Sequence, residues 1–464
     1  MIVYAIKLSK TVDNCVTFER ILDVLTGSSC EIEHFQHKFS ALNFMKKSIL
    51  FGFFVFGCSA LSIYSQSTQV KPAPTPSRVM VTSTLPPATA VRTPSPTPIP
   101  LPAKTPNVVG QNPPGASSQA SNLNYKGLSF AQIKAKLAEA KRQMQTRPIT
   151  TAMTEPPSAS SLVRIAYYDW RDKQVNYIVI SKDAFLTADS PTAAVSSNGR
   201  MVTSRTLRVN GVNTPITISD ETGQAQLPLM IQYPVEKGGH FIETAYYMST
   251  HPGLVTPEVV SAGRFYVHNI IEIARDQLRN KGYAVQPKVA DIAERLATVE
   301  HVDHLRFRTE FQPNIFNDIF TLYALNEGQT YRYSVSSAGA GGMVQMIPST
   351  YAMIRRLYPN AMLMPDFVEG MRNHVNASQA MLLYMEMTWN DIASRPSVSN
   401  ALAAGIATQE QLMAAGYNSN PSKLSGYIDR GGSGWTGLIP RETQIYLQIY
   451  DSLERNVSMA PRKQ

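Results

Sequence analysis

The spacing of apolar residues changes near residue 253, and the change predicts two kinds of structure. Between Leu162 and Tyr247 apolar residues recur with a period of two, which is typical of β-strands. Segments 162–168 and 175–180 are predicted strands around a turn at 171–173. Asn210-Gly211 predicts a second hairpin, between 206–209 and 215–218. We therefore expect a small β-rich domain over residues 159–252.

After this region the apolar spacing is helical. Thr256-Pro257-Glu258 combines a capping residue, a first-turn proline and an acidic first turn, which predicts a helix start. Further helices are expected after Pro287 and from Pro313. The pattern as a whole predicts an α+β fold, in which a mainly α-helical domain over residues 253–464 follows the β-rich domain.

A shorter helix is predicted ahead of the strands, within residues 123–158. Ser129 is a capping residue, and the polar stretch from Phe130 to Gln145 carries Ile133, Leu137 and Ala140 on one side. Residues 66–122 precede it and contain thirteen prolines and no acidic residue. Such a composition cannot bury enough apolar surface to offset the entropy of ordering, so we expect a disordered linker.

The pattern of an export signal lies at residues 45–65. Lys46-Lys47 precedes the short apolar run 49–57, which is followed by Cys58. This arrangement resembles a bacterial lipobox with Cys58 as the lipidated residue, and ordinary signal cleavage after Ala60 or Ser65 is the alternative. Residues 1–44 show no targeting pattern, and we expect them to be a mis-annotated extension. The chain is thus expected in the periplasm or cell envelope, with a possible lipid anchor to a membrane.

The net charge and the positions of the cysteines limit the classes of ligand and metal site that we expect. The net charge is +9 and the isoelectric point about 9.3, which suits an anionic polymer or surface. No cysteine follows Cys58, so the body of the chain has no disulfide framework and no thiolate metal site. No nucleic-acid-binding motif accompanies the positive charge.

One glutamate stands out by its position. Glu327 ends the helix predicted from Pro313, two residues after the apolar run Tyr323, Ala324 and Leu325. A carboxyl in an apolar cleft keeps its proton near neutral pH, and a protonated carboxyl can act as the general acid that cleaves a glycosidic bond.

The residues after Glu327 carry a family pattern. Gly339 lies twelve residues after it, Gln345 eighteen and Pro348 twenty-one. These offsets, together with blocks at 415–421 and 439–447, resemble the soluble-type lytic transglycosylases of glycoside hydrolase family 23. The resemblance covers about residues 313–453 and implies a lysozyme-like catalytic domain.

The resemblance also implies the reaction and the residues. Glu327 would protonate the bond between N-acetylmuramic acid and N-acetylglucosamine in peptidoglycan, and then act as the base that forms a 1,6-anhydromuramoyl end. The residues expected to bind substrate are Gln345, Tyr417, Asn418, Met343 and Tyr331. Those expected to support the site are Gly339, Gly342, Glu442 and Tyr446. No cofactor is implied. Cell-envelope proteins are possible partners of the β-rich domain.

Two departures from the family pattern leave alternatives open. Gly328 replaces the serine that follows the family's acid, and Ser419-Asn420 replaces Ala-Gly beside Asn418. These departures favour one alternative, a weakly active glycan-binding protein. The other alternative is a hydrolytic muramidase of the same fold, which would favour a second carboxylate placed to activate water. Glu300, His301, Asp303 and His304 superficially suggest a metal site, but their spacing does not match a zinc motif, and we interpret them as a polar helix end.

Overall fold

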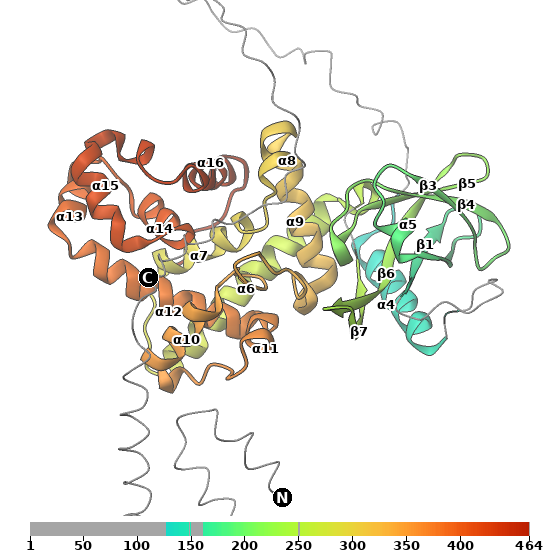
Figure 1. Cartoon of the computed structure of the whole chain (residues 1–464), viewed down its shortest axis with the longest axis horizontal. Coiled ribbons are helices and arrows are strands. Elements are labelled where there is room, and N and C mark those ends of the chain that lie inside the picture. Colours follow the sequence, from blue (N-terminus) through green and yellow to red (C-terminus); the bar gives the residue numbers. More distant parts are fainter. Residues whose placement is uncertain (1–126, 148, 150–160, 249–250, 464) are drawn as a thin grey trace, which may run out of the picture. The chain divides into compact units, whose positions relative to one another are not determined.

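The computed structural model describes residues 127–147, 149, 161–248 and 251–463 (Figure 1). The expected export signal, the lipidation site at Cys58 and the proline-rich linker lie outside these residues. Within the described ranges, no helix is both long enough and apolar enough to span a membrane.

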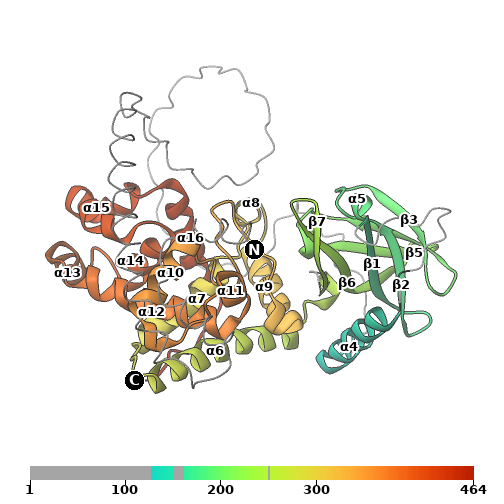
Figure 2. The ribbon, with the colours of Figure 1, turned by 60° about the horizontal axis from the view of Figure 1, so that its bottom comes forward.

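Helix α4 (Phe130–Thr146) begins as predicted at Ser129. The Ser129 hydroxyl accepts the backbone N–H of Gln132, and the Gln132 side chain accepts the N–H of Ser129, so both orphan donors are satisfied. Its buried residues form one stripe, Ile133, Leu137, Ala140 and Met144, and share a core with residues of β1 and β6. Figure 2 shows the helix lying along the sheet.

Seven antiparallel strands form one curled sheet over residues 162–247. They are β1 (Leu162–Asp169), β2 (Gln174–Ser181), β3 (Pro191–Val195), β4 (Met201–Thr206), β5 (Ile216–Asp220), β6 (Ala225–Lys237) and β7 (His240–Tyr247). The order is β2-β1-β6-β5-β4-β3, and β7 pairs with β6. The short helix α5 (Lys182–Phe185) follows β2.

Both faces of the central strands are buried. In β1, Val163, Ile165 and Tyr167 point into a core formed by the strands and Phe185 of α5, against which Tyr333 also packs. Ala166 and Tyr168 point the other way, into the core shared with the helices. Because successive side chains of a strand face opposite sides, this arrangement needs apolar residues at nearly every position of β1.

The predicted fold class needs correction. We expected an α+β chain in which a small β-rich domain precedes a lysozyme-like helical domain. The structure has instead a curled antiparallel half-barrel over residues 162–247, followed by a helical region. The curl depends on the long strand β6 and on register shifts at Ala166/Tyr167 and Val235/Glu236. A period of two predicts strands, but it contains no information on bulges or on which strands are neighbours.

The helical region begins with α6 (Pro257–Asn280), α7 (Pro287–Val299), α8 (His304–Thr309) and α9 (Gln312–Asn326). It continues with α10 (Pro348–Leu357), α11 (Phe367–Arg372), α12 (His374–Ala393), α13 (Pro396–Ala403), α14 (Gln409–Asn418), α15 (Leu424–Gly431) and α16 (Arg441–Asn456). Thr256 caps α6, and prolines occupy the first turns of α6, α7 and α9, as the sequence predicts. Helix α8 was not predicted.

Helices α6 and α9 approach each other closely at Gly263. A Cβ atom at this position would lie 1.8 Å from the backbone oxygen of Phe320 in α9. A backbone atom cannot move aside as a flexible side chain can, so only glycine permits this crossing. The crossing places the end of α9, and the loop that follows it, beside α6.

We expect Gly263→Ala to destabilise the protein by about 3 kcal/mol or more, because the methyl group would force α6 and α9 apart. Urea unfolding measures this change. Gly426→Ala in α15 is the matched control, since its Cβ would meet only the end of the Arg430 side chain, at 3.3 Å. Alanine in that helix should be neutral or stabilising by up to about 1 kcal/mol. Equal stability of the two variants would contradict the close crossing.

Candidate functional site

The loop after α9, residues 330–346, carries the glycine-rich motif. Two backbone bridges fold it on itself, between Val335 and Gly341 and between Gly341 and Met346. Gly339 and Gly342 have positive φ angles of 77° and 68°. A Cβ on Gly342 would lie 2.2 Å from the Met371 oxygen, so this predicted supporting glycine lets the loop pack against α11.

Two buried histidines stabilise this loop by hydrogen bonds to its backbone carbonyls. His301, one residue beyond the end cap of α7, stacks on Tyr331 with ring centroids 3.4 Å apart, and its Nε2 donates to the Met343 oxygen at 2.8 Å. His374 donates from Nε2 to the Thr330 oxygen at 2.7 Å, and its Nδ1 accepts the Tyr266 hydroxyl. Burial lowers the pKa of His301 to about 3 and that of His374 to about 4, so both rings are neutral at pH 7.

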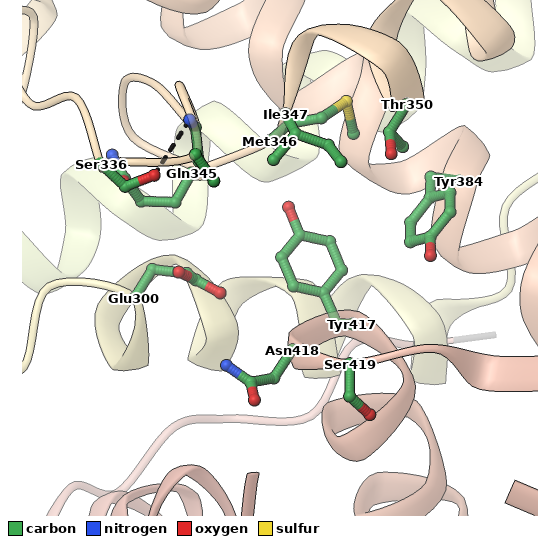
Figure 3. A pocket seen from close by; sticks show the side chains of 12 residues that line it. Glu300, Ser336, Gln345, Met346, Ile347, Thr350, Tyr384, Tyr417, Asn418 and Ser419 are labelled. Atoms are coloured by element: carbon green, nitrogen blue, oxygen red, sulfur yellow. Dashed lines mark hydrogen bonds between the residues drawn. The ribbon is translucent and has the colours of Figure 1, made fainter. Parts of the chain in front are cut away.

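A cavity of about 230 Å³ lies between this loop and the helices α7, α12 and α14 (Figure 3). Glu300 at the end of α7 faces it, with Tyr417 and Asn418 of α14 across from it and Gln345 in the loop above. The other lining residues are Ser336, Ala338, Ala340, Met346, Ile347, Thr350, Tyr384 and Ser419.

Glu300 is the one carboxylate among the residues that line this cavity. It follows the last residue of α7, and its backbone N–H bonds to the Leu296 oxygen, which continues the helical hydrogen bonding through the cap. The Tyr446 hydroxyl of α16 donates to Glu300 Oε1 at 2.8 Å. The predicted supporting residue Tyr446 therefore orients this carboxylate.

Tyr417 and Asn418 reach the cavity from the last turn of α14. The Tyr417 hydroxyl donates to the Val344 oxygen at 2.7 Å. Burial, with a smaller contribution from the charge of Glu300, raises the pKa of Tyr417 well above its usual value, so the phenol stays a donor. Asn418 Oδ1 accepts the Thr443 hydroxyl at 2.8 Å, whereas its buried Nδ2 has no hydrogen-bond partner among the described residues. In Figure 3 this nitrogen points toward Glu300.

The structure does not bring Glu327 to this cavity. Glu327 caps the end of α9 with a φ of 45°, and its side chain is 51% exposed. It pairs with Lys134 of α4, which is equally accessible. Its surroundings are therefore not the apolar cleft that we expected. A catalytic role for Glu327 stays a prediction that this geometry does not favour.

The remaining predicted residues are divided between different places. Gln345 lines the cavity, but its Nε2 donates to the Gly342 oxygen at 2.8 Å and so also holds the loop. Met343 belongs to this loop, but its side chain is fully buried and does not line the cavity. Tyr331 is buried against His301 and lines a second cavity. Glu442 is half-buried in the first turn of α16.

Glu300 is the residue that sequence reasoning missed. It follows the apolar helix segment ending in Val299, the same local pattern that singled out Glu327. We chose Glu327 because of its distance along the chain to Gly339 and Gln345. The sequence did contain a signal for Glu300, namely its group with His301, Asp303 and His304. We interpreted this group only as a polar helix end. Among the described residues, no cluster of three or more His, Cys, Asp or Glu could hold a metal ion.

Comparison with family models, with curated proteins and with solved structures finds no match to this chain.

We expect the ring protons of His301 and His374 to keep their neutral chemical shifts from pH 8 down to about pH 5 in the folded protein. In the unfolded chain both should titrate near 6.5. The unfolded state then binds more protons below that pH, so the stability contributed by the neutral rings is complete above about 6.5 and falls as the pH drops toward 4. A titration by NMR measures this, and a folded-state midpoint near 6.5 for either ring would contradict it.

Proposed function

We propose that the cavity around Glu300 cleaves the glycan strand of peptidoglycan as a lytic transglycosylase. The observation that supports this most directly is the single carboxylate Glu300, oriented by Tyr446 and facing Gln345, Tyr417 and Asn418. These last three are residues that the family resemblance assigns to substrate. The resemblance is thus kept for the cavity, while its acid is moved from Glu327 to Glu300.

A single carboxylate is sufficient for this reaction. Glu300 would donate its proton to the glycosidic oxygen as the bond to the muramoyl C1 breaks, and the acetamido group of the same sugar would capture C1. The ionised Glu300 would then take the proton of the 6-hydroxyl as that oxygen attacks C1. The bond to the acetamido oxygen breaks, and a 1,6-anhydro ring forms without consumption of water.

The polar groups around the cavity have roles in this scheme. The unpartnered Nδ2 of Asn418 is a buried donor, and a buried donor without an acceptor costs about 1–3 kcal/mol. A sugar oxygen or acetamido carbonyl in the cavity would satisfy it. The net charge of +9 favours an anionic polymer. Export through residues 45–65 and anchoring at Cys58 would place the protein in the cell envelope, where that polymer occurs.

We expect Glu300→Gln to reduce release of soluble fragments from purified sacculi by about 10²–10⁴-fold, because the amide cannot donate the proton. Glu327→Gln is the matched control and should retain activity within about threefold. Neither Glu327 nor its partner Lys134 lines the cavity, and their ion pair is exposed. Mass spectrometry of the fragments should show anhydromuramoyl ends.

Each other result has a distinct meaning. Loss of activity in Glu327→Gln alone would return the acid to Glu327 and contradict our assignment. Reducing ends alone would identify a hydrolytic muramidase. Sacculi that bind the wild-type protein without being solubilised would indicate a glycan-binding protein.

We expect Tyr446→Phe to lower kcat by about 10–100-fold with little change in KM, because a hydrogen bond to a charged group is worth about 1.5–3 kcal/mol. Tyr450→Phe is the control on the same helix. Tyr450 is equally buried, but its hydroxyl has no partner among the described residues, so its removal breaks no hydrogen bond. Similar kinetics for the two variants would show that Tyr446 does not orient Glu300.

A further inference from the structure

A second cavity, of about 650 Å³, opens on the other side of Glu300. We name it the β-side cavity, because one wall comes from the β-rich region: Glu236 of β6, Lys182 of α5, and Arg208 and Asn213 of the connection between β4 and β5. Its other wall comes from α8, α9 and the loop, including Asp303, Arg306, Asp318 and Tyr331. Glu300 lines both cavities, so a polymer bound at Glu300 has space to extend into each of them.

Most charges in the β-side cavity are compensated by neighbours. Lys182 pairs with Glu236 at 2.5 Å, and Arg306 pairs with Asp318 at 2.6 Å and with Glu310 at 2.8 Å. Asp303 caps α8 and accepts the backbone N–H groups of Leu305 and Arg306. These groups can line the cavity without a ligand.

Arg208 differs from these residues. It is half-buried, and among the described residues none forms an ion pair or a hydrogen bond with its guanidinium. Burial lowers its pKa, but an arginine in a protein keeps its charge. Asp303, Glu310 and Asp318 act on this charge and partly offset its burial, but none of them contacts the guanidinium. A partly desolvated charge without a hydrogen-bonded partner remains costly. An anionic group would do so, and a planar carboxylate matches the fork of guanidinium donors.

Two further polar atoms in this cavity lack partners. The Tyr331 hydroxyl is a buried donor on a residue that is 8% exposed, and Asn213 Oδ1 is a buried acceptor. Neither has a hydrogen-bond partner among the described residues. Arg208, Asn213 and Tyr331 thus line one cavity, and a negatively charged ligand would compensate the charge of Arg208.

We propose that the β-side cavity binds a carboxylate carried by the same glycan strand that Glu300 cleaves, with Arg208 as its partner. This inference rests on the proposed function. Muramic acid carries such a group as its free lactyl carboxylate or, where a stem peptide is attached, as the carboxylates of that peptide. The β-rich region would thus bind the carboxylate-bearing substituents of the glycan strand, while the helical region binds its sugars.

Binding to glycan strands tests this in the Glu300→Gln protein, which leaves the ligand intact. The probes are soluble peptide-bearing strands, the same strands after carbodiimide amidation of their carboxylates, and strands stripped of peptide by an amidase. We expect native peptide-bearing strands to bind about tenfold more tightly than amidated ones, and this ratio to fall to about one when Arg208→Gln is added. Binding of stripped strands that also depends on Arg208 would identify the lactyl carboxylate as a ligand, whereas dependence confined to peptide-bearing strands would identify the stem.

Arg205→Gln is the matched control, because Arg205 lies three residues away, pairs with Asp189 and does not line the cavity. It should preserve the tenfold ratio, and the melting temperatures of both variants should match that of the parent. A ratio that survives in Arg208→Gln, a ratio of one in the parent, or no binding by the parent would overturn the proposal. Activity of Glu300→Gln on sacculi would refute the proposed acid alone, while the comparison of affinities would still test Arg208.

Discussion

The shape of loop 330–346 depends on two imidazole rings that carry no charge. His301 and His374 each donate one hydrogen bond to a loop carbonyl, at Met343 and Thr330. If His374 were charged, its Nδ1 could not accept the Tyr266 hydroxyl. If His301 were charged, it would be poorly solvated against the stacked Tyr331 ring. The loop in turn supplies Gln345 to the cavity and the Val344 oxygen to the Tyr417 hydroxyl. The positions of two of the residues assigned to substrate therefore depend on these uncharged rings.

The end of α7 connects this support to the chemistry we propose. Glu300 faces the cavity, and the next residue, His301, lies under the loop. Because the two are adjacent on a helix end, any displacement of α7 moves the carboxylate and the loop together. Tyr446 reaches Glu300 from α16, and Thr443, one turn earlier on the same helix, donates to Asn418. The positions of Glu300 and Asn418 are thus fixed by contacts between α7, α14 and α16, which are far apart in the sequence.

Local signals in the sequence predicted local structure well. Ser129, Thr256 and the first-turn prolines marked helix starts because capping involves residues close together in the chain. The hairpin of β4 and β5 was also predicted, but its connection is longer than the two residues of Asn210-Gly211 and includes a short turn of helix at Gly211–Asn213. The curl of the sheet was not predictable, because it depends on the pairing of strands far apart in sequence. The same limit applies to Glu300, since two glutamates end apolar helices and only their contacts in three dimensions distinguish them.

The shared core between sheet and helices has a consequence for how such a chain can change. Tyr168, Leu229 and Tyr247 are buried in the same cluster as the helical residues Val267 and Phe320. The Asn326 side chain closes the junction, because it both donates to and accepts from the backbone of Met248 at 2.8 Å. The sheet is therefore not an interchangeable module in the evolutionary sense. A recombination event near residue 250 would join a sheet and a helical region whose apolar surfaces are not complementary. We therefore expect the sheet and the helical region to be inherited as a single unit.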